Sequence, residues 1–337
     1  MPSCDYIISV RGVKSGAWTN EPGPTRWLRV PSGSDPDPSF AATSEADRRK
    51  LVDEILMGAG GANAQGVLPP DPGTGQPPGD LLVFVHGYNN SVGEVIVRHR
   101  KIRAALKGRG YAGEVLSFDW PSGTSTLAYL EDRSDAKQTA FRLVEDCISV
   151  FATRVRAAGG NCGTNVHLLG HSTGAYVIRE AFDDADDRFS IAQVGWLVNQ
   201  AMFIAGDISS SSMSSGDASS RSLMARCRRI TNYSNPYDEV LNISNAKRLF
   251  ISARVGRVGL PSDAPSSCVD VNCGGYYASL KAPKSIIDRA AYSHSWYFDD
   301  PNGGFYDDVV STISGSLDRN VIPTRRVEAN GRLALRV

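Results

Sequence analysis

A serine flanked by glycines is the first residue whose surroundings indicate chemistry. Ser172 is the middle residue of the run GHSTG, which has the pattern GxSxG. The apolar run Val166–Leu169 precedes it, and a helical pattern over Ala175–Phe182 follows it. This order of strand, turn and helix is typical of a nucleophile elbow, in which a tight, strained turn projects the serine hydroxyl from the backbone. Ser172 is therefore predicted to be a nucleophile, and an ordinary turn of small residues is the alternative.

The base that such a serine needs can be found by its position in the chain. A serine hydroxyl is a poor nucleophile until a base removes its proton, and histidine is the usual base. Around elbows of this type the order along the chain is nucleophile, acid and base. Of the five histidines, only His294 follows Ser172. His294 is therefore the predicted base, with a surface histidine as the alternative.

The acid that orients the base should follow a strand between these two residues. Asp238 fits best, because it comes after the strand pattern Arg229–Tyr233 and a turn that contains proline. Asp207, at the end of the preceding apolar segment, is the rival, and Glu239 is the third choice. A helix cap is the alternative role for Asp238.

A second glycine turn, with the sequence HGYNNS at 86–91, follows the apolar run LLVFV. An acyl-transfer intermediate carries a negative oxygen that needs fixed hydrogen-bond donors. One donor is expected from the backbone N–H of the residue after the nucleophile, Thr173. The other is expected from Tyr88 in this turn, with Asn89 as the second choice. His86 is predicted to hold the turn in place by hydrogen bonds.

Three further residues are candidates for the substrate pocket: Asn89, Trp120 and His171. Trp120 follows the strand pattern Glu114–Phe118, and its large ring suits either an acyl pocket or the protein core. His171 adjoins the nucleophile, but its ring is expected to point away from the serine hydroxyl.

Together these residues predict two-step acyl transfer through a covalent intermediate. This chemistry needs no metal and no organic cofactor, and the sequence has no CxxC pair or histidine cluster typical of a metal site. The first functional hypothesis is a carboxylic-ester hydrolase acting on a small-molecule or polymeric ester. The second is a peptidase, amidase or acyltransferase with the same residues. The third is a non-catalytic interaction module that retains the fold.

The elements that must position these residues alternate between strands and helices. Apolar runs typical of strands lie at 81–85, 114–118, 166–169, 195–198 and 229–233. Helical spacing is found at 44–57, 92–109, 134–157 and 175–182. Two short strand patterns, at 6–10 and 27–30, come first. This alternation predicts a mainly parallel sheet with helices on both faces.

The main domain is predicted to span residues 81–312. Residues 1–80, which end in a Gly/Pro-rich loop at 58–80, should join it, and residues 313–337 should form a C-terminal extension. The serine-rich insertion at 208–222 is expected to be a mobile excursion that buries little apolar surface. Residues 254–292 are expected to form a long irregular stretch before His294.

Composition and charge disfavour several other classes of protein. The 337 residues include 36 basic and 36 acidic ones, whereas a nucleic-acid binder usually has a basic excess. No apolar run is long enough to span a bilayer, and the first residues do not form a secretory signal. We therefore expect a cytoplasmic protein. Its six cysteines are expected to be free thiols, with a bond between Cys268 and Cys273 as the alternative.

Several short motifs together resemble a known family. The runs VFVHGYNNS, LSFDWPSG, LLGHSTG, NYSNPYDEVL and HSWYFDD are similar to a bacterial branch of α/β hydrolases catalogued as a domain of unknown function. The resemblance covers about residues 80–312. It implies an α/β-hydrolase fold with Ser172, Asp238 and His294 as the catalytic triad and with Tyr88 in the oxyanion loop. It implies little about the substrate.

Overall fold

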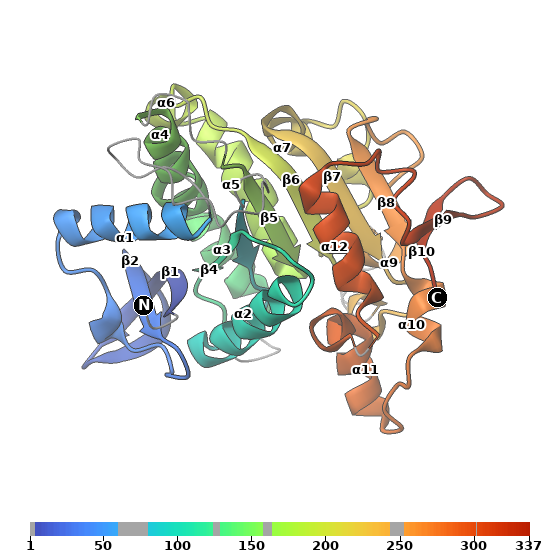
Figure 1. The fold of residues 1–337 in the computed structure, drawn as a ribbon, viewed down its shortest axis with the longest axis horizontal. Helices are drawn as coiled ribbons and strands as arrows, with labels where there is room; N and C mark the ends of the chain where they lie inside the picture. Colours follow the sequence, from blue (N-terminus) through green and yellow to red (C-terminus); the bar gives the residue numbers. More distant parts are fainter. Residues whose placement is uncertain (1–3, 60–79, 124–128, 158–163, 243–252, 301) are drawn as a thin grey trace.

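A single ten-stranded sheet runs through the computed structural model of the chain (Figure 1). The structure describes residues 4–59, 80–123, 129–300 and 302–337, except 158–163 and 243–252. The strand order is β2-β1-β4-β3-β5-β6-β7-β8-β10-β9. All neighbours pair in parallel except the outermost strands, β2 and β9, which are antiparallel to β1 and β10. The predicted mainly parallel sheet is thereby confirmed. The strands are β1 (Cys4–Lys14), β2 (Ala17–Pro31), β3 (Leu81–Val85), β4 (Glu114–Asp119), β5 (Val166–His171), β6 (Val198–Ile204), β7 (Cys227–Ser234), β8 (Cys268–Asn272), β9 (Arg325–Val327) and β10 (Leu333–Leu335).

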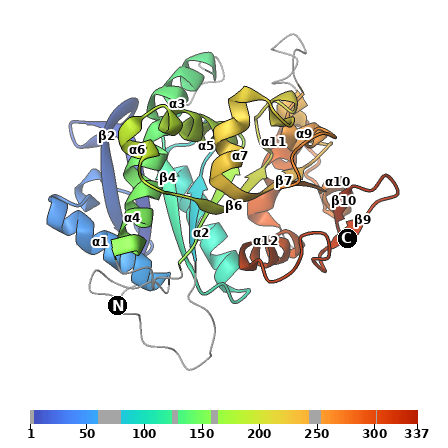
Figure 2. The same ribbon diagram turned by 90° about the horizontal axis from the view of Figure 1, so that it is seen from above.

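Helices cover both faces of this sheet, as Figure 2 shows for α5 and α7 on one side and α2 and α12 on the other. The central strand β3 is buried at all five positions because it lies between the two apolar layers. One layer packs against α1 (Glu45–Gly58), α3 (Tyr129–Leu143), α4 (Ser149–Ala157), α5 (Thr173–Asp186), α6 (Phe189–Ala192) and α7 (Arg221–Arg226). The other packs against α2 (Val92–Lys107), α10 (Gly274–Ser279), α11 (Ile286–Ser295) and α12 (Gly304–Ser314).

The parallel pairing brings the turns of interest to one edge of the sheet. Strands β3, β5 and β7 all run in the same direction, so the turns that follow them share the carboxyl edge. Ligands and catalytic residues of open α/β sheets gather at this edge. The fold therefore places the segments after Val85, His171 and Ser234 near one another.

Both ends of the chain contribute strands to the same sheet. The N-terminal hairpin joins it through parallel pairing of β1 with β4, for example Tyr6 with Leu116. At the other end, β10 pairs with β8 and extends the sheet within residues 313–337. The predicted strands at 6–10 and 27–30 are confirmed, but each is several residues longer.

Several other predicted elements also have different bounds in the structure. The helix predicted over 134–157 begins at Tyr129, and a π-helical turn at Val144–Ile148 divides it into α3 and α4. The strand predicted at 195–198 begins at Val198 and continues to Ile204. The residues before it lie outside the strand, and Trp196 among them packs edge-on against Phe182, with 4.9 Å between ring centroids.

The two excursions expected from the sequence are more ordered than predicted. The serine-rich run forms two 3-10 turns, η3 (Ser211–Met213) and η4 (Ala218–Ser220), followed by α7. Its two large apolar residues, Ile208 and Met213, are fully buried and anchor it. The stretch 254–292 contains α9 (Val255–Val258), α10 and the sheet strand β8. Most of the loop predicted at 58–80 lies outside the described residues.

Two further expectations concern the thiols and membrane insertion. Cys268 and Cys273 are free thiols, as are the other cysteines that the structure describes. Within the described ranges, no helix combines the length and the apolar character needed to cross a bilayer.

Candidate active site

The backbone at Ser172 has the strained conformation that a nucleophile elbow requires. Ser172 lies between the end of β5 and the start of α5, with φ 54° and ψ −122°. Few residues with a Cβ adopt positive φ, so the surrounding contacts must hold it there. Its N–H donates to the carbonyl of Ile204, and its own carbonyl accepts from the N–H of Asp207, each at 3.0 Å. The neighbouring strand thus fixes the turn.

Glycine is required on both sides of the serine. A Cβ atom at residue 174 would lie 2.2 Å from the carbonyl oxygen of Val85. A Cβ atom at residue 170 would lie 3.0 Å from the Cα of Ala175. Because both contacts involve backbone, they cannot be relieved by a side-chain rotation. The two glycines of the GxSxG pattern thus let the turn pack closely against β3 and α5.

His294 and Asp238 form a direct hydrogen bond. His294 lies in the last turn of α11, and its Nδ1 is 2.7 Å from Oδ2 of Asp238. Asp238 is fully buried in the turn after β7, and its Oδ1 also accepts from the N–H of Leu241. The two roles considered for Asp238, partner of the base and local cap, are therefore both filled by one carboxylate. The Nδ1 contact leaves Nε2 of His294 as the nitrogen that can exchange a proton.

The predicted base lies against the elbow. The ring of His294 is 4.9 Å from the ring of His171, the residue directly before the nucleophile. Helix α11 is thereby packed on the end of β5, although the two histidines are 123 positions apart in the sequence. The structure thus brings the predicted nucleophile, base and acid to one place on the sheet.

The two rival acids face other partners. The carboxylate of Asp207 lies 3.0 Å from Nε of Arg254, and this ion pair is buried. The carboxylate of Glu239 pairs with Arg289 at 3.3 Å on the surface. Asp238 is therefore the one of the three candidates that contacts His294.

Two residues that sequence reasoning missed hold the turn of Asp238. Asn235 donates from its side chain to the carbonyl of Ser293, at 2.9 Å. Arg257 donates to the carbonyl of Asp238 itself, at 2.8 Å. These contacts connect the acid turn with α11 on one side and with α9 on the other. The run NYSNPYDE marks the turn in the sequence, but nothing local indicates that Arg257 reaches it.

The turn after β3 lies in close contact with Ser172, the predicted nucleophile. A Cβ atom at residue 87 would lie 2.8 Å from Cβ of Ser172 and 3.0 Å from the carbonyl oxygen of His171. The glycine is thus needed for the close approach that an oxyanion loop must make.

We expect Gly87→Ala to lower kcat on an ester by about 100-fold, because the added methyl group would push the loop donor away from the reacting carbonyl. Steady-state kinetics with an activated ester would measure this loss. The matched control is Gly93→Ala in α2, where the nearest atom to an added Cβ is 3.8 Å away. Equal activity of the two variants would contradict the role assigned to the loop.

Side chains of the same loop orient its peptide groups. The carbonyl of Gly87 accepts hydrogen bonds from Nδ1 of His86, at 2.7 Å, and from the side chain of Asn90, at 2.8 Å. The N–H of Tyr88 belongs to the same trans peptide, so it points away from Asn90. The carbonyl of Tyr88 also accepts from Asn90, which orients the N–H of Asn89 in the same way. His86 has the structural role expected from the sequence, whereas the role of Asn90 was missed.

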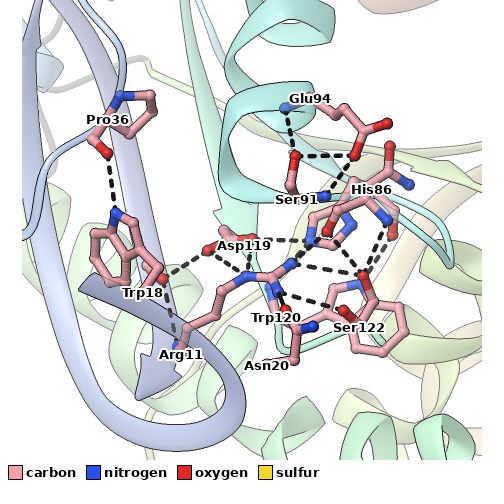
Figure 3. Close-up of polar contacts among 12 residues, drawn as sticks. Arg11, Trp18, Asn20, Pro36, His86, Ser91, Glu94, Asp119, Trp120 and Ser122 are labelled. Atoms are coloured by element: carbon pink, nitrogen blue, oxygen red, sulfur yellow. Dashed lines mark hydrogen bonds and ion pairs between the residues drawn. The ribbon is translucent and has the colours of Figure 1, made fainter. Parts of the chain in front are cut away.

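A buried ion pair from the N-terminal hairpin supports this loop (Figure 3). Nε of Arg11 is 2.9 Å from Oδ1 of Asp119, and both side chains are almost completely buried. The same guanidinium donates to the carbonyl of Asn90, at 2.7 Å. Nε2 of His86 lies 3.1 Å from Oδ1 of Asp119, and the hydroxyl of Ser9 donates to Oδ2 of Asp119, at 2.6 Å. Sequence reasoning missed this network, because its members come from two strands, β1 and β4, and from the loop after β3.

The charges in this network stabilise one another. Burial alone would raise the pKa of Asp119, but the guanidinium of Arg11 and the hydrogen bond from the hydroxyl of Ser9 oppose it, and the net result is a lowered pKa. Burial lowers the pKa of His86, against the opposing effect of Asp119. Asp119 is therefore ionised at neutral pH and holds Arg11 beneath the loop.

Arg11→Met should reduce the free energy of unfolding by about 3–5 kcal/mol, because it leaves the Asp119 carboxylate buried without its counter-charge. Chemical denaturation followed by circular dichroism would measure the change. The double variant Arg11→Met/Asp119→Asn should recover part of the loss, since no unpaired charge remains. A loss below about 1 kcal/mol for Arg11→Met would show that the pair does not stabilise the fold.

The three candidates for a substrate pocket occupy different environments. Asn89 is exposed and has φ 56° at the tip of the loop. Trp120 is fully buried, stacks on His86 and donates from Nε1 to the carbonyl of His86, at 2.8 Å. Its ring therefore packs in the core beneath the loop. His171 is buried as well, between α11 and the 3-10 turn η5 (Trp296–Asp299).

Among the residues that the structure describes, no group of three or more His, Cys, Asp or Glu side chains is arranged so that it could hold a metal ion.

Comparison with solved structures finds distant similarities. A cutinase-like protein from Cryptococcus sp. is 14% identical, with a TM-score of 0.35 over 71% of this chain and 97% of that one. An acetylxylan esterase is also 14% identical, with a TM-score of 0.35 over 70% and 99%. Aspergillus fumigatus lipase B is 13% identical, with a TM-score of 0.39 over 87% and 64%. A search among curated proteins finds no match.

A protein-family model matches the central part of the chain. The family is described as an alpha/beta hydrolase of unknown function (DUF900), and the match covers residues 74–267. This span is more than half of the 337 residues and includes both glycine turns and the turn of Asp238. The chain belongs to the DUF900 family of alpha/beta hydrolases.

Proposed function

We propose that the protein is a serine-dependent carboxylic-ester hydrolase that works through an acyl-enzyme intermediate. The observation that carries the proposal is the hydrogen bond of 2.7 Å between His294 and Asp238, beside the strained elbow of Ser172. A nucleophile, a base and an acid arranged in this way are what acyl transfer requires. Membership of an alpha/beta hydrolase family agrees with this chemistry.

In the first step, Oγ of Ser172 attacks the carbonyl carbon of the ester while Nε2 of His294 accepts the hydroxyl proton. The carbonyl oxygen becomes an anion, for which the N–H groups of Thr173 and Tyr88 are the proposed donors. Thr173 is the first residue of α5, and the first N–H groups of a helix have no acceptor within it. The tetrahedral intermediate then collapses, and protonated His294 gives its proton to the departing alcohol.

In the second step, water attacks the acyl-enzyme and His294 accepts its proton. Collapse of the second intermediate releases the acid and returns the proton to Ser172. Throughout, Asp238 keeps the proton of His294 on Nδ1, so that Nε2 faces the reaction. The buried position of Asp238 strengthens its interaction with the positively charged imidazole.

Covalent labelling would test the nucleophile directly. A fluorophosphonate probe should attach to the intact protein with loss of fluoride, and peptide mapping should locate the label on Ser172. Labelling of another serine, or none at all in folded protein, would contradict the proposal and favour a non-catalytic module.

A substrate panel would then separate the possible acyl-bond reactions. We expect turnover of simple esters without turnover of the corresponding amides. Faster cleavage of amides would indicate a peptidase or amidase, and transfer of the acyl group to an added alcohol in preference to water would indicate an acyltransferase. All three use the same residues, so the products decide between them.

A further inference from the structure

His171 connects the strand of the nucleophile to the backbone of the base. Its Nε2 lies 3.1 Å from the carbonyl oxygen of His294. Its ring is 2% exposed and lies 4.9 Å from the rings of His294 and Phe298. The contact is made by the residue next to Ser172, so it fixes the base relative to the nucleophile and not only to the acid.

A guanidinium group faces the other ring nitrogen of His171. Nη1 of Arg98, in α2, is 3.4 Å from Nδ1 of His171. The same guanidinium lies over the ring of Phe298, with its carbon 4.9 Å from the ring centroid. Phe298 and His171 therefore hold the charged group between α2 and η5. A guanidinium has N–H donors and no acceptor, so it can only donate to this nitrogen.

These two contacts are compatible with one protonation state of the ring. Burial, with the nearby charges of His294 and Arg98, holds the pKa of His171 well below its usual value, so the ring is neutral at neutral pH. A neutral imidazole has one donor and one acceptor nitrogen. Nδ1 faces a donor and must accept, so the proton lies on Nε2, where it can be donated to the carbonyl of His294. The opposite tautomer would make both contacts repulsive.

We propose that Arg98 is a positioning residue for the base: together with the carbonyl of His294 it favours the Nε2–H tautomer of His171, which in turn ties the backbone of His294 to the strand of Ser172. Its effect on catalysis rests on the proposed function, but the tautomer of His171 does not. Asp238 sets the orientation of the His294 ring, and His171 sets the position of its backbone. A displacement of about 1 Å at such a group can cost up to about 100-fold in rate.

Nitrogen NMR of protein labelled with ¹⁵N-histidine would test the tautomer without any substrate. The five histidines give a tractable spectrum, and His171→Gln would identify the signals of His171. We expect the wild-type ring to be neutral and protonated on Nε2. Arg98→Met removes the donors and keeps an unbranched apolar stem. One of the two contacts that favour Nε2–H is then lost, so the fraction of His171 protonated on Nδ1 should rise. Protonation on Nδ1 in the wild type, or an unchanged tautomer in folded Arg98→Met, would overturn the proposal.

Kinetics would test the consequence for the base. On an activated ester, Arg98→Met should lower kcat by about 10-fold with KM within about twofold, and Arg98→Lys should recover most of the loss because it keeps a donor. The matched control is Lys101→Met, one turn further along α2, which removes an ion pair to Asp299 in η5. It should leave both the tautomer and kcat unchanged.

A second pair of variants at the histidine itself keeps the test independent of Arg98. His171→Phe retains an aromatic ring but has no donor, so kcat should fall as in Arg98→Met. His171→Gln retains an N–H at the end of the side chain and should recover part of that activity. A shifted tautomer with unchanged kcat, or equal activity of the two His171 variants, would overturn the positioning role. An absence of any ester turnover would instead count against the proposed function and leave the NMR result standing.

Discussion

Ser172→Ala is expected to lower kcat on an activated ester by about 10⁴-fold or more, because the atom that forms the covalent intermediate is lost. Alanine meets the same backbone strain at φ 54° as serine does, so the fold should be retained. Steady-state kinetics and thermal unfolding would measure the two quantities. The rate that remains would come from binding and from the oxyanion donors alone.

A serine elsewhere on the surface provides the control for this variant. Ser311 lies in α12, where its hydroxyl donates to the carbonyl of Asp307 within the helix. Ser311→Ala should keep full activity and should still be labelled by a fluorophosphonate. Retention of more than about a tenth of the wild-type kcat by Ser172→Ala would assign the nucleophile to another residue.

Asp238→Asn is expected to lower kcat by about 10²–10⁴-fold, the second largest effect. Asparagine has almost the same shape, but its amide group can donate to Nδ1 of His294 and so favour the tautomer that carries the proton on Nε2. A base with its proton already on the reactive nitrogen cannot accept one from Ser172. Kinetics over a range of pH would show the loss, and the ¹⁵N spectrum of His294 would show the altered tautomer.

Asp207→Asn distinguishes this explanation from a general effect of neutralising a buried carboxylate near the elbow. Asp207 is as buried as Asp238 and hydrogen-bonds the backbone of Ser172, but its carboxylate faces Arg254. Asp207→Asn should therefore reduce stability more than it reduces kcat. A larger kcat loss for Asp207→Asn than for Asp238→Asn would reverse the assignment of the acid.

The candidate nucleophile and the candidate base could be proposed from the sequence because their signals are local or positional. Gly170 and Gly174 form a local pattern with Ser172, although the contact that requires Gly174 is with Val85 in β3. His294 is selected by its place after the serine. The acid was narrowed to three residues, since each of them follows a strand or a strand end. Asp238 is distinguished from the other two candidates by the packing of α11 against the turn after β7. No local sequence pattern predicts this packing.

The parts that the sequence did not reveal depend on long-range contacts. Arg11 reaches Asn90, 79 positions away, and Arg98 reaches His171 across 73 positions. Neither arginine stands in a run that differs from an ordinary strand or an amphipathic helix. The serine-rich run was expected to be unpacked because its composition is polar, yet Ile208 and Met213 are buried and the backbone of the run hydrogen-bonds to Ala253 and Asp263. The composition of a segment does not indicate which of its few apolar side chains will be buried in the fold.

The continuous sheet has a consequence for any shortened form of the protein. The family match ends at residue 267, just before β8, and begins after the N-terminal hairpin. A fragment limited to 74–267 would leave the edges of β4 and β7 without their neighbours, and open strand edges of this kind promote association between chains. It would also lack residue 294. Such a fragment should therefore aggregate, and the smallest active unit should extend from the first hairpin to at least α12.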